Sequence, residues 1–295
     1  MSINLEGKIV VLTGATSGIG FETALEFIRQ GIFVIATGRS IEKCREAEER
    51  VRQIVPEAKF SFLAADLSSL AEIIKLSEAI IKTIHAEGRN SIDVLIHNAG
   101  TFTSWYISTP EGFETQFAVN HLAPFMLTHH LMPLLAAAPE ARVITMSSGS
   151  HYHTRINWED ILLRKHYHCL AAYKQSKLCN VLFSRELKRR TQHMNLSVFA
   201  ADPGLVNTEM GLKNTSGIAK WVWAIRKRGG VPPREAARSI VWLAGEPSIS
   251  HSDQLYWKYC RPQKPSQYSE KSGEALKLWL LSEKMCGIHS IDFGI

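Results

Sequence analysis

The chain of 295 residues is 45% hydrophobic and 21% charged, which provides enough apolar material for one substantial core. Its formal charge is +6, but basic residues are mostly interleaved with acidic ones, so the composition does not predict a nucleic-acid interface. The five cysteines are scattered and form no Cys-x-x-Cys pair, which argues against a disulfide framework or a cysteine zinc site.

Short segments rich in branched residues alternate with helical patterns along the chain. The expected strands, in chain order, are Lys8 to Leu12, Ile32 to Thr37, Phe60 to Ala64, Ile92 to His97, Arg142 to Met146 and Leu196 to Ala201. Between them lie stretches such as Leu70 to Ala86, in which isoleucine and leucine recur at helical spacing. This alternation predicts an α/β fold, a doubly wound parallel sheet of the Rossmann type in a single domain over residues 1–295.

The first expected strand leads directly into a glycine-rich turn, Thr13-Gly-Ala-Thr-Ser-Gly-Ile-Gly20, and then into a helical pattern. Glycines permit a tight turn, so that a diphosphate can approach the N–H groups and the dipole at the N-terminus of a helix. The turn therefore predicts a dinucleotide site. Its expected contacts are Gly14, Thr16, Ser17, Gly18, Ile19 and Gly20.

The second expected strand ends in Thr37-Gly-Arg-Ser40, without a carboxylate. In dinucleotide folds an acid near this point holds the ribose 2′-hydroxyl of NAD, whereas an arginine accommodates the 2′-phosphate of NADP. We therefore predict that Arg39, with Ser40 and Ser17 as neighbours, makes NADP(H) the preferred cofactor and leaves NAD(H) as the alternative. A surface arginine at the start of a helix is the structural explanation of the same pattern.

Asp66 and Leu67 follow the third expected strand, at the edge where the adenine of a dinucleotide would lie. We expect the Asp66 carboxylate to accept a hydrogen bond from the adenine amine. Alternatively, Asp66 caps a helix that begins near Ser68.

Tyr173-Lys-Gln-Ser-Lys177 places a phenol and an ammonium one helical turn apart on the same face. A tyrosine with a pKa near 10 is a poor base at neutral pH, but a nearby cation and an oxidised nicotinamide favour the phenolate. Because Tyr-x-x-x-Lys is common on ordinary helices, this pair alone does not predict an active site.

The order and spacing of six motifs resemble the short-chain dehydrogenase/reductase family. They are the glycine turn, Asn98-Ala-Gly100, Asn120, Ser147-Ser148, Tyr173 with Lys177, and Pro203-Gly-Leu-Val-Asn-Thr208. The resemblance extends from about Glu6 to Leu281. Stretches around Ser148, Tyr173 and Leu278 are similar to retinol dehydrogenases and to the dehydrogenase domain of the WW-domain-containing oxidoreductase.

The resemblance implies catalytic roles for four residues. Tyr173 is expected to be the general acid in reduction and the base in oxidation, while Lys177 lowers its pKa and binds the nicotinamide ribose. Ser148 is expected to hold the substrate oxygen. It is chosen over Ser147 because the retinol-dehydrogenase branch places its serine 25 residues before the tyrosine. Asn120 is expected to position a water that links Lys177 to solvent. A helix-cap role for Ser148 and a packing or backbone-bonding role for Asn120 are the structural alternatives.

The resemblance also implies further contacts to the cofactor, and among them Thr208 and Val206 would contact the carboxamide and fix which nicotinamide face donates hydride. The other expected contacts are Asn98, Ala99, Gly100, Tyr173, Lys177, Pro203 and Gly204.

The insert between Ser148 and Tyr173 carries four histidines, His151, His153, His166 and His168. Without a third-ligand pattern we predict no metal, and we expect the histidines to line a pocket or lie in a solvated loop.

The predicted activity is hydride transfer between NADP(H) and the carbonyl or alcohol carbon of a lipophilic small molecule, namely a retinoid, a steroid or an aromatic aldehyde or ketone. The alternative is an NADP-binding regulatory or scaffold protein with little turnover. The family also suggests a homodimer that pairs through the helices bearing Asn120 and Tyr173.

Residues 205–231 follow the sixth expected strand, where we expect a lid over the substrate. Their central part, Ile218 to Arg228, combines tryptophan and isoleucine with four basic residues, which also suits a helix in an anionic membrane interface. Simple packing on the core is the third interpretation. Without a secretory signal or an apolar run that could span a bilayer, we expect an intracellular, cytoplasmic protein with at most peripheral membrane contact.

Overall fold

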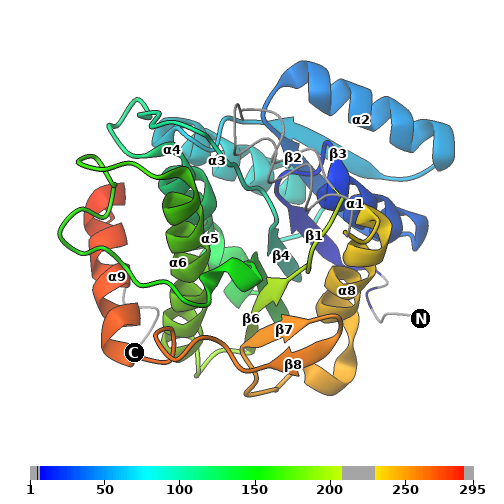
Figure 1. Ribbon diagram of the computed structural model, residues 1–295. Coiled ribbons are helices and arrows are strands. Elements are labelled where there is room, and N and C mark those ends of the chain that lie inside the picture. Colours follow the sequence, from blue (N-terminus) through cyan, green and yellow to red (C-terminus); the bar gives the residue numbers. More distant parts are fainter. Residues whose placement is uncertain (1–4, 6, 208–229, 289–295) are drawn as a thin grey trace.

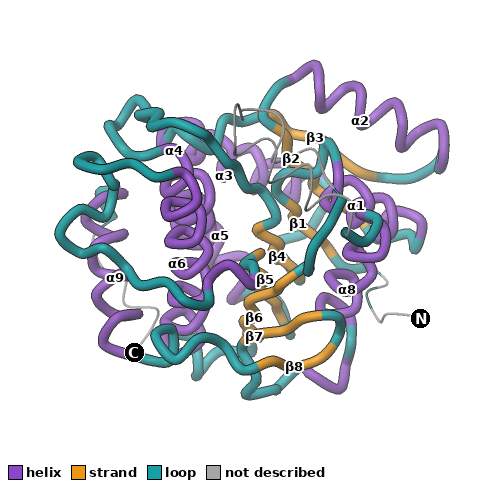
Figure 2. The backbone as a smooth tube through the Cα atoms, viewed as in Figure 1, coloured by secondary structure: helices purple, strands orange, loops and turns teal. Residues whose placement is uncertain are grey.

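The computed structural model describes residue 5, residues 7–207 and residues 230–288. Within these residues one eight-stranded sheet has the order β3-β2-β1-β4-β5-β6-β7-β8 (Figures 1 and 2). The strands are β1 (Ile9–Leu12), β2 (Phe33–Gly38), β3 (Phe60–Ala64), β4 (Val94–His97), β5 (Ala141–Met146), β6 (Leu196–Asp202), β7 (Tyr256–Lys258) and β8 (Arg261–Gln263). β1 to β7 are parallel, and β8 is antiparallel to β7. The predicted doubly wound single-domain fold is confirmed.

Helices cover both faces of the sheet. They are α1 (Gly18–Arg29), α2 (Ile41–Ile54), α3 (Leu70–Ala86), α4 (Thr115–Phe117), α5 (Ala123–Ala136), α6 (Cys169–Arg190), α8 (Pro233–Gly245) and α9 (Ser272–Cys286). Alternate strand residues face opposite cores: Ile9 and Val11 of β1 pack with α3, α5, α6 and α9, whereas Val10 and Leu12 pack with α1, α2 and α8. Burial on both faces explains why the central strands are continuous apolar runs.

The six strands expected from the sequence match the observed bounds to within two residues, but the β7–β8 hairpin was not predicted. Each of its strands has only three residues, and β8 is the exposed run Arg-Pro-Gln. Neither the apolar pattern nor the length of a typical strand is therefore present.

Helix α9 packs against α6 (Figure 1) and reaches α5 through Trp279 and Phe125. The Trp279 ring stacks on Phe183 at 6.0 Å between centroids, and meets the edge of Phe125 at 4.9 Å. The neighbouring Ser282 hydroxyl lies 2.8 Å from Nε2 of the buried His121. The expected homodimer pairs through the helices that bear Asn120 and Tyr173, and α9 occupies part of that face. Pairing of two chains through the part of this face that α9 leaves exposed stays a proposal.

The two ends of the expected lid are joined by backbone hydrogen bonds. Val231 N donates to Leu205 O at 2.8 Å, and Asn207 N donates to Val231 O at 3.0 Å. The lid itself, the basic segment 218–228 and Thr208 lie outside the described residues. No helix in the described part of the chain has both the length and the apolar character that crossing a membrane requires.

Candidate active site

The glycine turn lies at the carboxyl end of β1 and is tightly packed. Gly14 has a φ of +69°, and a Cβ on it would lie 2.7 Å from the Cα of Ala99. A Cβ on Gly20, in the first turn of α1, would lie 2.2 Å from the Gly14 carbonyl oxygen and 2.4 Å from Nδ2 of Asn98. Because nothing larger than glycine fits at these two positions, the backbone of the turn is held close to the start of α1.

Asn98 supports this turn from the end of β4. Its Nδ2 donates to the carbonyl oxygens of Thr13 and Gly14, both at 2.9 Å, and Ala99 N donates to the Thr13 hydroxyl at 3.1 Å. The sequence predicted cofactor contacts here. The structure adds a positioning role for Asn98, because its side chain holds the glycine turn. Ala99 and Gly100 follow Asn98 directly in the chain.

Arg39 stands beside the same turn. A Cβ on Gly38 would lie 2.3 Å from the side-chain methyl of Thr16, so the end of β2 touches the turn directly. Arg39 and Ser17 are exposed, and Ser17 precedes α1 without using its hydroxyl to cap the helix. Ser40 caps α2, because its hydroxyl accepts from Lys43 N at 3.3 Å. Among the described residues no carboxylate forms an ion pair with Arg39.

Asp66 forms a local turn at the end of β3. Its Oδ1 accepts from the backbone N–H and the hydroxyl of Ser68, at 2.9 and 2.8 Å. Helix α3 begins at Leu70 and is capped by Ser69. The alternative in which Asp66 caps a helix beginning near Ser68 is therefore wrong, because the chain makes one more turn before the helix starts. Leu67 is half-buried between these two elements.

Tyr173 and Lys177 lie one turn apart on α6, and Lys177 reaches the end of β5. The Lys177 side chain is buried, and its Nζ donates to the Met146 carbonyl oxygen at 3.1 Å and lies 5.7 Å from the centroid of the Tyr173 ring. Burial lowers the pKa of Lys177 to about 8, and the Asp202 carboxylate raises it in partial opposition. The half-buried Tyr173 ring meets Phe102 edge to face at 5.7 Å.

The two serines after β5 have different surroundings. Ser147 is buried, and its hydroxyl donates to the Lys177 carbonyl oxygen at 2.8 Å. Ser148 is half-buried and precedes a single 3-10 turn, Gly149–His151, where its Oγ accepts from Ser150 N at 3.2 Å. The expected alternative of a cap is thus present, yet the Ser148 hydroxyl keeps its proton for donation. Ser147 instead supports α6.

Asn120 lies in a π-helical turn, Ala118–Leu122, that joins α4 to α5. It is fully buried; Oδ1 accepts from Thr101 N at 2.7 Å, and Nδ2 donates to Thr101 O and to the Ser176 hydroxyl. The backbone-bonding alternative is therefore observed. Both amide protons are used, so the side chain could hold a water only through the remaining lone pair of Oδ1.

His151, in the insert between Ser148 and Tyr173, is fully buried rather than lining a solvated loop. Its Nδ1 lies 2.8 Å from the Ser148 carbonyl oxygen, and its Nε2 accepts from Ser266 N at 3.1 Å. The other three histidines of the insert are exposed, and His168 caps α6. In the described parts of the chain no group of three potential ligands could hold a metal ion.

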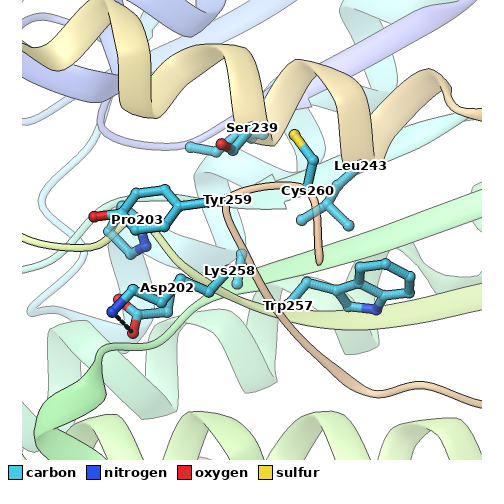
Figure 3. Close-up of a pocket in the computed structure, with 10 residues that line it drawn as sticks. Asp202, Pro203, Ser239, Leu243, Trp257, Lys258, Tyr259 and Cys260 are labelled. Atoms are coloured by element: carbon cyan, nitrogen blue, oxygen red, sulfur yellow. Dashed lines mark ion pairs between the residues drawn. The ribbon is translucent and has the colours of Figure 1, made fainter. Parts of the chain in front are cut away.

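A charged cluster that the sequence analysis missed borders the Pro203-Gly204 turn (Figure 3). Asp202, the last residue of β6, is buried, and its Oδ2 accepts from the Tyr256 hydroxyl at 3.1 Å and lies 3.5 Å from Nζ of Lys258. Its Oδ1 accepts from Gly204 N at 2.8 Å. The sequence did show one sign of this cluster, an acidic residue at the carboxyl end of an expected strand. Its partners were hidden because they lie on the unpredicted hairpin.

The order of these elements agrees with known proteins. A family model described as short chain dehydrogenase matches residues 8–218. The chain belongs to the short-chain dehydrogenase family. It is 32% identical to human retinol dehydrogenase 14 over 300 residues, which covers 96% of this chain and 88% of that protein. It is 33% identical to human retinol dehydrogenase 13, with 97% and 86% covered. The predicted resemblance to the retinol-dehydrogenase branch is confirmed.

Solved structures agree with this family at the level of the fold. An uncharacterised protein from Mycobacterium Paratuberculosis superposes on this short-chain dehydrogenase with a TM-score of 0.72 at 30% identity, and covers 96% of this chain and 94% of its own. A short chain dehydrogenase from Shigella flexneri 2a, solved in complex with NADP, has a TM-score of 0.66 at 22% identity, with 86% and 98% covered. This chain is therefore a Rossmann-type oxidoreductase of the retinol-dehydrogenase-like group.

Proposed function

We propose that this short-chain dehydrogenase transfers a hydride between NADP(H) and the carbonyl or alcohol carbon of a lipophilic small molecule: a retinoid, a steroid or an aromatic aldehyde or ketone. The observation that carries the proposal is the buried Lys177 ammonium beside the Tyr173 ring, on the helix that follows Ser148. A phenol beside a buried cation suits proton transfer to a substrate oxygen, because the cation stabilises the phenolate that the transfer leaves behind.

The chain also offers a fitting cradle for a dinucleotide, because Gly14 and Gly20 leave no room for a Cβ and the turn ends at the N-terminus of α1. The bound nicotinamide would supply or accept the hydride. Tyr173 donates its phenolic proton to the substrate oxygen during reduction, and Lys177 stabilises the resulting phenolate. Ser148 donates a hydrogen bond to the same oxygen and so orients the carbonyl for attack.

Support for NADP(H) comes from Arg39. Arg39 is exposed and directly follows Gly38, which touches Thr16 of the glycine turn, and among the described residues no carboxylate forms an ion pair with it. An arginine without a carboxylate partner at this point suits the 2′-phosphate that distinguishes NADP from NAD.

Support for a lipophilic substrate comes from apolar side chains after the strand ends. Phe102 contacts Tyr173, and Trp105, Leu205 and Tyr259 are exposed although they are large and hydrophobic. Exposed apolar residues near a ligand site favour apolar ligands. The relatives are named retinol dehydrogenases, and retinol is such a ligand.

The function is tested by following NADPH oxidation with a panel of retinoid, steroid and aromatic carbonyls, and NADP reduction with the matching alcohols. We expect turnover with at least one lipophilic pair. Tight NADPH binding with no turnover across the panel would support the alternative of an NADP-binding regulatory or scaffold protein.

The two serines offer a first variant test of the site. We expect Ser148→Ala to lower kcat/KM about tenfold through the loss of one hydrogen bond to the reacting oxygen. Its effect on Tm should be small, because the hydroxyl caps only a single 3-10 turn. Ser147→Ala should lower Tm by a few degrees, because a buried hydrogen bond to α6 is lost, roughly 1 kcal/mol. Steady-state kinetics and thermal melts of both variants decide the assignment. If Ser147→Ala lost the activity while Ser148→Ala kept it, the assignment would be reversed.

Peripheral membrane contact through residues 218–228 is proposed from the sequence alone. Each basic residue near an anionic surface contributes about 1 kcal/mol, and the two tryptophans could enter the interface. The chain should therefore co-sediment with anionic vesicles and not with neutral ones, and a Trp221→Ala, Trp223→Ala double variant should bind more weakly. If the native chain stayed in the supernatant to the same extent with anionic and with neutral vesicles, this contact would be excluded.

A further inference from the structure

Lys177 is a buried cation whose described hydrogen bond goes to a neutral group, the Met146 carbonyl oxygen. Burying an ammonium without a compensating negative charge favours its neutral form. The proposed chemistry needs the charged form, because only a cation stabilises a phenolate on Tyr173. A nearby buried acid would therefore have a function here.

The register of the sheet places Asp202 at the same edge. Met146 pairs with Ala201 across β5 and β6, and Ser147 N donates to Ala201 O at 2.7 Å. Asp202 follows Ala201 directly, and a Cβ on Gly149 would lie 3.3 Å from its Oδ2. The carboxylate thus lies under the loop that carries Ser148, beside the strand end to which Lys177 is bonded.

Asp202 is buried, with an exposed fraction of 4%, yet it receives three polar contacts that suit an ionised carboxylate. They come from Gly204 N, the Tyr256 hydroxyl and Lys258 Nζ. Figure 3 shows Lys258 reaching Asp202 from the β7–β8 hairpin, while the Tyr259 ring lies beside Pro203. A buried charge with these partners is retained more readily than an isolated one.

We propose that Asp202 is a positioning residue that keeps Lys177 charged, and that Lys258 limits this effect by pairing with the same carboxylate. The proposal rests on the proposed roles of Tyr173 and Lys177. Asp202 and Lys258 would together set the upper pH at which carbonyl reduction proceeds, since loss of the Lys177 proton removes the cation that stabilises the phenolate.

The other titratable groups around Asp202 do not supply this charge. Tyr256 and Tyr152 have raised pKa values, because burial and the Asp202 charge both disfavour their phenolates. Burial lowers the pKa of His151, although its hydrogen bond to Ser148 and the Asp202 charge oppose the change. The tyrosines stay neutral near neutral pH, so Asp202 and Lys258 are the charged groups of this cluster.

The direction of the effect follows from the charges. Asp202→Asn keeps an Oδ1 that accepts from Gly204 N, and its amide nitrogen takes the place of Oδ2, where it can donate to the Tyr256 hydroxyl oxygen. The substitution removes the negative charge, so the pKa of Lys177 should fall by about one pH unit. Lys258→Met removes a cation and frees the carboxylate from its partner, so the pKa of Lys177 should rise. A purely structural role for Asp202 predicts no such opposite pair of changes.

The test measures Lys177 directly, by NMR titration of protein labelled at the lysine ε-carbons, with the resonance assigned from its loss in Lys177→Met. Lys75→Met is the matched control, because Lys75 lies on an exposed face of α3 and pairs with Glu72. We expect a lower pKa in Asp202→Asn, a higher pKa in Lys258→Met and no change in the control. An unchanged Lys177 pKa in a folded Asp202→Asn protein would overturn the proposal. If that variant does not fold, an unchanged pKa in Lys258→Met has the same meaning.

The kinetic readout is the pH profile of kcat/KM for carbonyl reduction at saturating NADPH. Its alkaline limb should move to lower pH in Asp202→Asn, so that activity at pH 8.5 falls about tenfold more than activity at pH 6.5. The limb should move to higher pH in Lys258→Met. Absence of turnover in the native enzyme would contradict the proposed function but leave the NMR result standing. Native turnover with the same limb in all three proteins would contradict only the role of Asp202.

Discussion

Tyr173→Phe is expected to lower kcat/KM for carbonyl reduction by about a thousandfold, because a positioned general acid contributes roughly 10² to 10⁴ in rate. The phenylalanine keeps the ring and its contact with Phe102, so the site keeps its shape. The lost hydroxyl transfers the proton, whereas the glycine turn, Arg39 and Lys177 are expected to hold most of the dinucleotide, and the ring of residue 173 is kept. NADPH affinity, measured by fluorescence titration, should therefore change by no more than about twofold, well under 1 kcal/mol.

Two further variants sharpen this test. Lys177→Met should damage both turnover and NADPH binding, since Lys177 is proposed to contact the ribose as well as the phenolate. Tyr268→Phe removes a phenol bonded to Glu274 near α9 and should leave the activity unchanged. If Tyr173→Phe retained most of the native activity on the best substrate, the acid role would belong to another group.

Arg39→Ala is expected to abolish a preference for NADPH over NADH of roughly ten- to a hundredfold in affinity. A charge-assisted hydrogen bond to the 2′-phosphate contributes about 1.5–3 kcal/mol, which corresponds to this ratio. NADH lacks the phosphate, so its affinity should hardly change in the variant. Paired fluorescence titrations of the native and variant proteins with both cofactors measure the difference.

The control for Arg39 is Arg29→Ala, which removes an equal charge from the exposed last turn of α1. It should leave the NADPH preference intact, because the effect depends on a contact and is not a consequence of net charge. High salt should weaken the native preference by screening the exposed guanidinium. Equal affinity of the native protein for NADPH and NADH would contradict the assignment of Arg39.

The sequence by itself determined the layers of this protein and the position of its glycine turn. Apolar strands alternating with amphipathic helices admit few arrangements other than a covered parallel sheet, since the information lies in local periodicity. The turn at Gly14 to Gly20 could be predicted equally well, because positions with no room for a Cβ require glycine and the sequence shows glycine there.

The tertiary structure alone decided which residues of the site act together. Asn98 holds the glycine turn, Ser147 supports α6 and Asp202 meets Lys258, and each of these contacts joins residues far apart in the chain. The hairpin that brings Lys258 and Tyr259 to the site turns through Tyr259 and Cys260, with φ values of 49° and 58°. Such a turn normally carries asparagine or glycine, so its local signal was absent. Charge, burial and hydrogen bonds at this edge of the sheet depend on how segments far apart in the chain pack together. A local sequence pattern cannot predict that packing.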